Sequence, residues 1–327
     1  MPESNERWSP AHDAALEHAW GEYRVWAATA RRQKADLFAW RLRVLLLTVI
    51  GAVLGTLSYQ LEHQGDDDRF WDVSVPTLGI LAGITVGLAT YFSREILSPG
   101  RERHWVRARS VAEALKSETF RFRTGIPPFH EPGAPETLLK RVDAIEEPAR
   151  DVQRVALEGT GRRERLPAGP LSMDAYIAER VDDQIERFYI PRARQHETML
   201  RRGRSITLFL GGAAVVLGVV GVTGWTTGWV AALATLVAAV GAYLHGGRYQ
   251  YLVVSYQSTA AQLQTLKARW RVLGGGADKA RGDELIQSFE DVISIENSAW
   301  MSKLLKDDAV SVPKVGAASG PETKPAT

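Results

Sequence analysis

Four acidic side chains between two long uncharged runs are the residues best suited to act on an ion. Glu62, Asp66, Asp67 and Asp68 lie in a short stretch that also holds Arg69. In an oligomer they would form acidic rings at the outer mouth of a pore and attract cations. A second interpretation is that they only satisfy the rule that keeps basic residues out of external loops.

Small polar groups in the first of these runs indicate what would line such a pore. Thr48, Gly55, Thr56 and Tyr59 lie roughly on one face of a helix over 44–61. A pore needs polar groups of this kind together with a hydrophobic gate. The alternative is that the threonine hydroxyls donate to carbonyl oxygens of their own helix.

Two residues, His245 and Arg248, follow the last apolar run at its expected inner interface. A histidine there could titrate near neutral pH. Basic residues on that side could also bind the headgroups of anionic lipids. The simpler interpretation of His245 is an interfacial residue that has no function of its own.

The sequence contains no pattern typical of an enzyme or a metal site. It has no cysteine, which excludes disulfides, iron–sulfur clusters and thiolate zinc sites. P-loop, HExxH and GxSxG motifs are absent, and the seven histidines have no ligand spacing. The 40 basic and 38 acidic residues leave no strong basic excess. We therefore expect no catalysis, no cofactor, no metal and no nucleic-acid partner.

The elements that must position these residues are apolar runs long enough to cross a bilayer. A hydrocarbon core of about 30 Å needs roughly 20 apolar residues in a helix. Residues 44–61, 73–93 and 205–247 carry no charged side chain, and TGWTTGW at 223–229 predicts a turn inside the longest run. The sequence thus predicts an all-α integral membrane protein of two two-span hairpins, with spans at about 44–61, 75–93, 206–224 and 228–246.

The distribution of charge predicts the orientation of these spans. Basic residues cluster before the first span, after the second and before the third, whereas the 62–72 connection is mostly acidic. Lysine and arginine are retained on the cytoplasmic side. We expect a multi-pass membrane protein with both termini in the cytoplasm.

Small residues at four-residue spacing predict close contacts between helices. The contacts could lie within one subunit, or one stripe could join subunits of a homo-oligomer; the candidate for the second role is Gly79, Gly83 and Gly87. The residues in these stripes are Gly51, Gly79, Gly83, Gly87, Ala214, Gly218, Ala234 and Ala238.

The same order of events occurs twice along the chain. A basic, aromatic-rich helix enters a two-span hairpin, which leaves into a polar helix, and the second occurrence starts at Ser172, a predicted N-cap. Pro191 should kink or restart the helix that approaches the third span. The predicted divisions are a first unit at 1–123, a Pro- and Gly-rich connector at 124–171, a second unit at 172–305 and a disordered tail at 306–327.

The aromatic and basic helices of both units carry a family resemblance. It rests on Trp20, Tyr23, Trp26 and the run 27–43, and in the second unit on 189–204, 255–270 and 288–300. These segments resemble the SLATT family, two-transmembrane effector domains associated with SMODS nucleotidyltransferases and SLOG domains. The resemblance implies two tandem copies of a membrane effector for bacterial defence systems that signal with nucleotides, and it implies no catalytic residue.

Together these features favour an oligomeric, pore-forming or ion-conducting effector that is gated through its cytoplasmic helices. Its expected partners are its own copies, membrane lipids, and a cytoplasmic signalling protein or nucleotide. The alternative is a membrane-anchored sensor or scaffold whose spans never open. No charged residue lies at membrane depth in any span, which disfavours ion-coupled transport.

Overall fold

The computed structural model describes residues 8–62, 69–155, 168–221, 224–272 and 279–294, and every regular element in these ranges is helical. Four helices are long and apolar enough to cross a membrane, so the fold is an all-α integral membrane protein, as predicted. In chain order the elements are α1 (Pro10–Glu62), α2 (Arg69–Glu95), α3 (Pro99–Thr124), α4 (Ala134–Glu146), η1 (Glu147–Ala149), α5 (Met173–Tyr176), η2 (Ile177–Val181), η3 (Asp183–Tyr189), α6 (Ile190–Val220), α7 (Gly224–Gly246), α8 (Tyr249–Val272) and a helix at 279–294.

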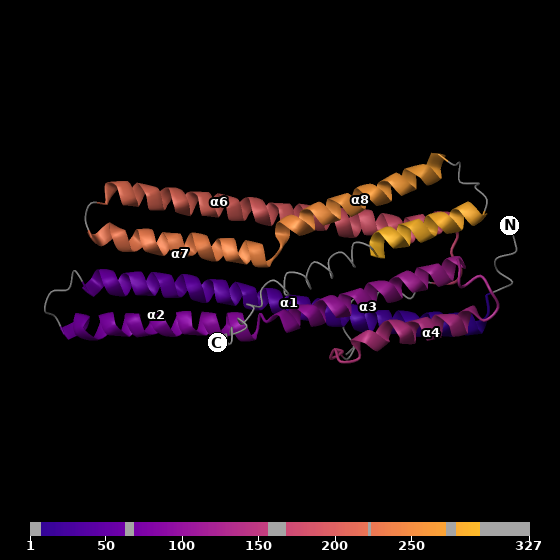
Figure 1. Cartoon of the computed structure of the whole chain (residues 1–327), viewed down its shortest axis with the longest axis horizontal. Coiled ribbons are helices and arrows are strands. Elements are labelled where there is room, and N and C mark those ends of the chain that lie inside the picture. The colour runs from indigo at the N-terminus through magenta and orange to yellow at the C-terminus, as the bar shows by residue number, and fades with distance from the viewer. Residues whose placement is uncertain (1–7, 63–68, 156–167, 222–223, 273–278, 295–327) are drawn as a thin grey trace, which may run out of the picture.

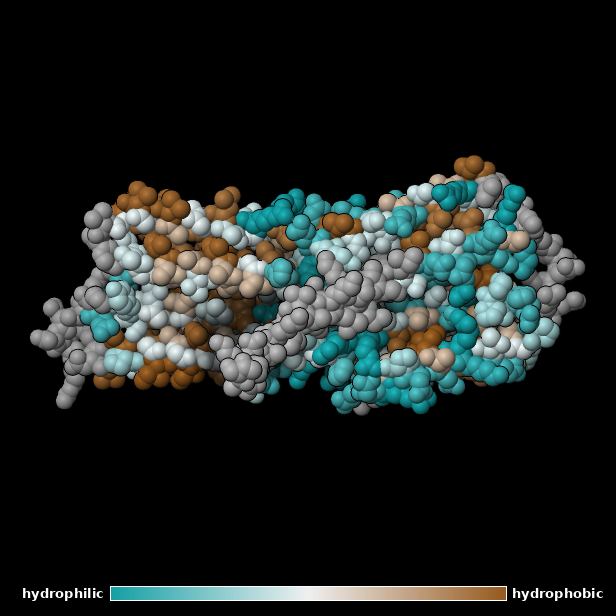
Figure 2. All heavy atoms as spheres, in the orientation of Figure 1, coloured by the Kyte–Doolittle hydropathy of each residue, from teal (hydrophilic) through white to brown (hydrophobic). Residues whose placement is uncertain are grey.

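The apolar parts of the long helices form two hairpins at one end of the molecule. α1 pairs with α2 and α6 with α7, and α1 also contacts α7, which joins the hairpins side by side (Figure 1). Brown, apolar side chains cover much of this end, whereas teal, polar side chains dominate the other end (Figure 2). We call residues 44–62, 69–95, 205–220 and 224–246 the apolar bundle, and the remaining described residues the polar body.

The surface of the apolar bundle is suited to lipid and not to water. Leu208 and Phe209 of α6 remain 78% and 76% exposed. Exposed apolar patches of this kind mark a membrane or a protein interface. The hairpins therefore expose the apolar side chains that a bilayer or a second subunit would cover.

One hydrophobic core joins both halves of the chain inside the polar body. Trp26 of α1, Leu115 of α3, Tyr176 of α5, Leu263 of α8 and Phe289 of helix 279–294 are all fully buried members of it. Because these residues come from both predicted units, the polar body packs as one structure and not as one core per unit.

The helices of the polar body run directly into the spans. α1 continues for 53 residues from the polar body into the first hairpin. Ahead of the third span, η2 and η3 are π-helical, and the backbone N–H of Ile190 donates to the carbonyl of Ile185. Pro191, which has no N–H of its own, follows at once in α6. The helix therefore restarts here, as predicted: α6 begins at Ile190 with Pro191 in its first turn.

Local signals explain where several elements begin and end. Ser172 caps its helix as predicted, because its hydroxyl accepts a hydrogen bond from the backbone N–H of Ala175 at 3.3 Å. Within the connector, α4 ends at Glu146, because Pro148 interrupts it and the chain continues as a 3₁₀ turn. The second hairpin turns earlier than predicted, with α6 ending at Val220 and α7 beginning at Gly224. The expected tail at 306–327 lies outside the described residues.

Candidate functional site

A crevice separates the two hairpins at the end of the bundle that adjoins the polar body. It encloses about 520 Å³ between α1 and α7. Thr48 lines it from α1, and Thr235, Ala238 and Ala242 line it from α7. The small alanine side chains leave space here, so the predicted stripe that includes Ala238 borders a cavity.

The hairpins close together towards their loop end. A Cβ atom placed on Gly228 of α7 would lie 2.7 Å from Nε2 of Gln60, 3.4 Å from Tyr59 and 3.5 Å from Thr56. Glycine at this position lets α7 approach α1 without displacing the end of the Gln60 side chain. The space between α1 and α7 is therefore wide beside the polar body and closed at the opposite end.

The predicted pore-lining residues divide between two faces of α1. Thr48, Thr56 and Tyr59 face α7, but Gly55 lies 3.7 Å from the Cβ of Ala82 in α2, measured from its own ideal Cβ position. Gly55 therefore packs towards α2 and the other three towards α7, because α1 has two neighbours, and the pore-lining role of all four stays a prediction. The hydroxyls of Thr48 and Thr56 donate at 2.9 Å to the carbonyls of Val44 and Ala52, as in the alternative interpretation.

The predicted outer mouth is only partly within the described chain. Glu62 is the last residue of α1 and is exposed. Asp66, Asp67 and Asp68 lie outside the described residues. The acidic ring at this position therefore stays a prediction.

The small-residue stripes contain both contact positions and open positions. A Cβ on Gly51 would lie 2.7 Å from Cγ2 of Val86, and one on Gly79 would lie 3.3 Å from the Ser58 hydroxyl, so both glycines pack inside the first hairpin. Cβ atoms on Gly83, Gly87 and Gly218 would meet nothing within 4 Å. Ala214 is half-buried, and Ala234 and Ala238 are exposed.

The predicted inner interface forms a second, polar cavity. His245 and Arg248 border a space of about 770 Å³ together with Arg41 and Arg204. The carboxylate of Glu102 in α3 lies 3.3 Å from the Arg41 guanidinium and 4.0 Å from that of Arg248. Arg248 has a positive φ of 50°, which turns the chain sharply between α7 and α8. His245 and Arg248, which we predicted at the inner interface, thus lie close to side chains of α1 and α3.

A second group of basic side chains lies in the polar body: Lys34, Arg109, Arg192 and His196. Burial, followed by the charges of Arg192 and Arg109, lowers the pKa of Lys34 from 10.5 to about 8. Burial, followed by Lys34 and Arg192, lowers the pKa of His196 from 6.5 to about 4. The His196 ring lies against the rings of Tyr249 and Tyr256. The group joins α1, α3 and α6 at the point where they approach the spans.

A buried ion pair fastens helix 279–294 to the rest of the polar body. The Arg180 guanidinium donates to both carboxylate oxygens of Glu290 at 3.1 and 3.0 Å, and the Tyr176 hydroxyl donates to the same carboxylate at 2.8 Å. The Arg180 and Glu290 side chains are 0% and 2% exposed. Burial alone would raise the pKa of Glu290, but Arg180 and Tyr176 hold it below its ordinary value.

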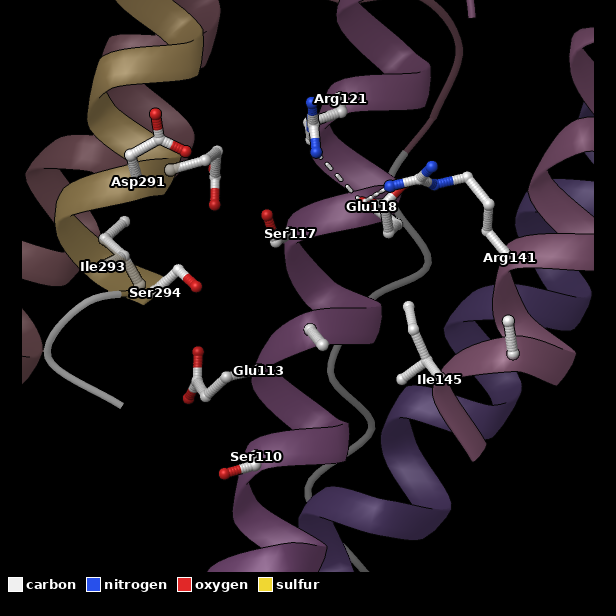
Figure 3. A pocket seen from close by; sticks show the side chains of 13 residues that line it. Ser110, Glu113, Ser117, Glu118, Arg121, Arg141, Ile145, Asp291, Ile293 and Ser294 are labelled. Carbon is white, nitrogen blue, oxygen red and sulfur yellow. Dashed lines mark hydrogen bonds and ion pairs between the residues drawn. The ribbon is translucent and has the colours of Figure 1, made fainter. Parts of the chain in front are cut away.

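A cavity of about 470 Å³ lies beside this ion pair, between α3, α4 and helix 279–294 (Figure 3). Glu118 accepts hydrogen bonds from Arg141 at 2.9 Å and from Arg121 at 3.1 Å on one of its walls. Glu113 points from α3 towards Ser294, and one of its carboxylate oxygens has no hydrogen-bond partner among the described residues. No group of acidic or histidine side chains among the described residues is arranged to hold a metal ion.

Three structural features escaped the sequence analysis. Gly228 and Gly203 are close-approach positions; a Cβ on Gly203 would collide with the Leu244 side chain in the second hairpin. The pairing of Arg180 with Glu290 joins residues 110 positions apart. A glycine next to the third span could have been noticed, but nothing local in the sequence distinguishes Arg180 from the other arginines.

The second two-span unit matches a known family. Residues 176–300 fit the description "SMODS and SLOG-associating 2TM effector domain 1" (SLATT). The second unit is a SLATT domain. This confirms the resemblance for that unit, and the domain so defined includes Tyr176, Arg180 and Glu290. The buried ion pair therefore lies inside the SLATT domain and connects its first residues with its last helix.

The first unit matches a different family. Residues 24–137 fit a protein family of unknown function, DUF4231. No curated protein and no solved structure matches the chain. Although α1, α2 and α3 repeat the order of α6, α7 and α8, a second SLATT copy in the first unit stays a prediction. The two halves of the chain thus match two different families.

Proposed function

We propose that this protein is a pore-forming, ion-conducting effector that assembles as a homo-oligomer in the bacterial inner membrane. Both termini and the polar body would lie in the cytoplasm. The SLATT domain supports the effector role, and the clustering of basic residues at the body end of the spans supports the orientation. The proposed activity needs neither catalysis nor a cofactor.

The observation that carries this proposal is the shape of the space between the hairpins. It is wide and partly hydroxyl-lined around Thr48 and Thr235, and it closes where Gly228 meets Gln60. A closed constriction in series with a wider vestibule is the arrangement expected of a gated path at rest. Separation of α1 from α7 would open it.

The continuous helices provide a route by which the polar body could control that separation. α1 carries Trp26, whose indole N–H donates to Glu146 at 2.6 Å, on the same helix as Thr56 and Tyr59. A cytoplasmic signalling protein or a nucleotide that moved α4 against α1 would shift a helix that extends across the membrane. This is the proposed link between signal and conductance.

Single-channel recording of the purified protein in planar bilayers tests the proposal. Under a cation gradient we expect discrete unitary steps, and we expect Glu62→Gln to reduce cation preference in the reversal potential. Bilayers fused with protein-free vesicles in the same detergent are the control. Persistent silence across pH, membrane tension and candidate nucleotides would contradict the pore.

The competing function, a membrane-anchored sensor or scaffold, is favoured by one feature, the cavity next to Glu113. Its volume of about 470 Å³ falls within the range of small-ligand sites. In that case a ligand would bind the polar body while conductance stayed absent. Binding measured without any conductance response would favour this function.

A further inference from the structure

The polar cavity and the hairpin crevice adjoin one another. Arg41 and Gly246 line both of them. One space is bordered largely by apolar side chains at membrane depth, and the other by charged side chains at the end of the spans. Because they share these two residues, we take the two together as one amphipathic groove, which we call the hairpin groove.

The crevice part of the hairpin groove is suited to an alkyl chain. Val44, Leu45 and Thr48 border it from α1, opposite Ala238, Ala239 and Ala242 of α7. The seven steps along the helix from Arg41 to Thr48 cover about 10 Å, which is about a third of the hydrocarbon core.

The polar part of the hairpin groove carries excess positive charge. Arg41, Arg204 and Arg248 face a single carboxylate, that of Glu102, among the residues that line it. Glu102 approaches Arg41 and Arg248 but not Arg204, and no acidic partner of Arg204 occurs in the described part of the chain. Three arginines against one glutamate leave a site that attracts a phosphate group.

We propose that the hairpin groove binds one anionic phospholipid, with an acyl chain in the crevice between α1 and α7 and its phosphate at Arg41, Arg204 and Arg248. Basic pockets between membrane helices at the cytoplasmic face are suited to such headgroups. The bound chain would fill the space between the hairpins, so lipid occupancy would set their separation.

Native mass spectrometry of the full-length protein, released from vesicles of phosphatidylglycerol and phosphatidylcholine, tests the site. We expect preferential retention of phosphatidylglycerol. Arg204→Gln should reduce that preference about fivefold, the contribution of one arginine near a membrane surface. Ala238→Leu should fill the crevice and lower the retention of both lipids.

Matched variants separate this site from general attraction to the membrane. Arg202→Gln removes another exposed arginine of α6, and Ala234→Leu enlarges an exposed alanine of α7; neither residue lines the groove. Both should retain lipid as the unmodified protein does. Equal losses in Arg202→Gln and Arg204→Gln, or an absence of headgroup preference, would overturn the proposal.

A second measurement distinguishes a lipid from a soluble anion. Inorganic phosphate, exchanged for chloride at constant ionic strength, should not displace the retained phosphatidylglycerol. Displacement that requires Arg204 would assign the groove to free phosphate and reject the lipid. The unfolding temperatures of Arg204→Gln and Ala238→Leu should equal that of the unmodified protein, which shows that their loss of lipid does not come from unfolding.

Discussion

A charged pair without access to solvent connects two ends of the SLATT domain. Arg180 lies in η2 and Glu290 in helix 279–294, and their bidentate contact is completed by Tyr176. The Glu290 charge raises the pKa of Arg180 even though burial acts in the opposite direction. Both side chains therefore stay ionised, and each charge offsets the free-energy cost of burying the other.

Removal of one partner should destabilise the polar body strongly. Glu290→Ala leaves the Arg180 charge buried without a carboxylate, and we expect the free energy of unfolding to fall by about 3–5 kcal/mol. Denaturant titration in detergent measures this change. Arg180→Met combined with Glu290→Met should recover most of the loss, because no charge then stays buried.

An exposed ion pair, that of Asp183 and Arg187, serves as the control. Asp183→Asn breaks the contact with Arg187, whose side chain is 84% exposed, and should cost less than about 1 kcal/mol. Similar losses of unfolding free energy in Asp183→Asn and Glu290→Ala would show that burial does not determine how much the Arg180–Glu290 pair contributes to stability.

The lowered pKa of His196 predicts a dependence of stability on pH. The folded protein keeps this imidazole neutral down to about pH 4, whereas an unfolded chain protonates it near 6.5. The unfolded state therefore gains the proton first, and the free energy of unfolding should fall as the pH drops from 6.5 towards 4. Burial and the neighbouring cations Lys34 and Arg192 are the cause.

Comparison with His196→Gln isolates this contribution. Glutamine stays neutral at every pH, so the difference in unfolding temperature between the two proteins should change between pH 6.5 and 4 and stay constant from 7 to 8. A constant difference over the whole range would mean that His196 does not titrate as we infer.

At the scale of single elements, glycines decide how closely the spans pack. Gly51 allows α1 and α2 to meet, Gly203 allows α6 and α7 to meet, and Gly228 allows the hairpins to meet. Lipid offers no hydrophobic driving force between helices, so close approach of this kind supplies much of the association energy.

Gly51→Ala should weaken the first hairpin. Its Cβ would lie 2.7 Å from a methyl of Val86, whose branched side chain has little freedom to move away. We expect a loss of about 1–3 kcal/mol, reduced by the gain in helix propensity of about 1 kcal/mol. Thermal unfolding in detergent measures it.

Gly83→Ala is the matched control for that substitution. Its Cβ would meet nothing within 4 Å, so only the gain in helix propensity applies and the unfolding temperature should stay equal or rise. If the two variants behave alike, packing inside the hairpin is not what Gly51 provides.

At the scale of the whole molecule, the apolar bundle exposes a surface that the described residues leave uncovered. Gly83 and Gly87 lie on an open side of α2, next to the exposed side chains of Ile80 and Ile84. A glycine stripe on such a surface lets a neighbouring helix approach its backbone. This supports the proposed homo-oligomer without defining the number of subunits.

Gly83→Leu should dissociate that oligomer. The added side chain has space within the subunit but would block a close helix–helix contact from outside. Light scattering with size-exclusion chromatography in detergent gives the assembly mass. Gly211→Leu, at another open glycine on α6, is the control, and an unchanged mass for Gly83→Leu would place the subunit contact elsewhere.

The sequence by itself determined the helical fold, the four spans and the family of the second unit. These properties are local: uncharged runs must form helices in lipid, because each backbone group needs a partner within its own segment. The N-cap at Ser172 was also predictable, because it depends only on residues next to it in the sequence. Thr48 and Thr56 were found on one face, since helical spacing alone places them there.

Only the tertiary structure decided which of these residues meet. Gly51, Gly79, Gly83 and Gly87 look alike in the sequence, but the rotation of α2 against α1 turns the first two inwards and leaves the others open. Gly55 faces α2 while Thr56 faces α7, because α1 has two neighbours. The Arg180–Glu290 pair and the hairpin groove arise from helices far apart in the chain, and helical periodicity carries no information about which helix packs against which.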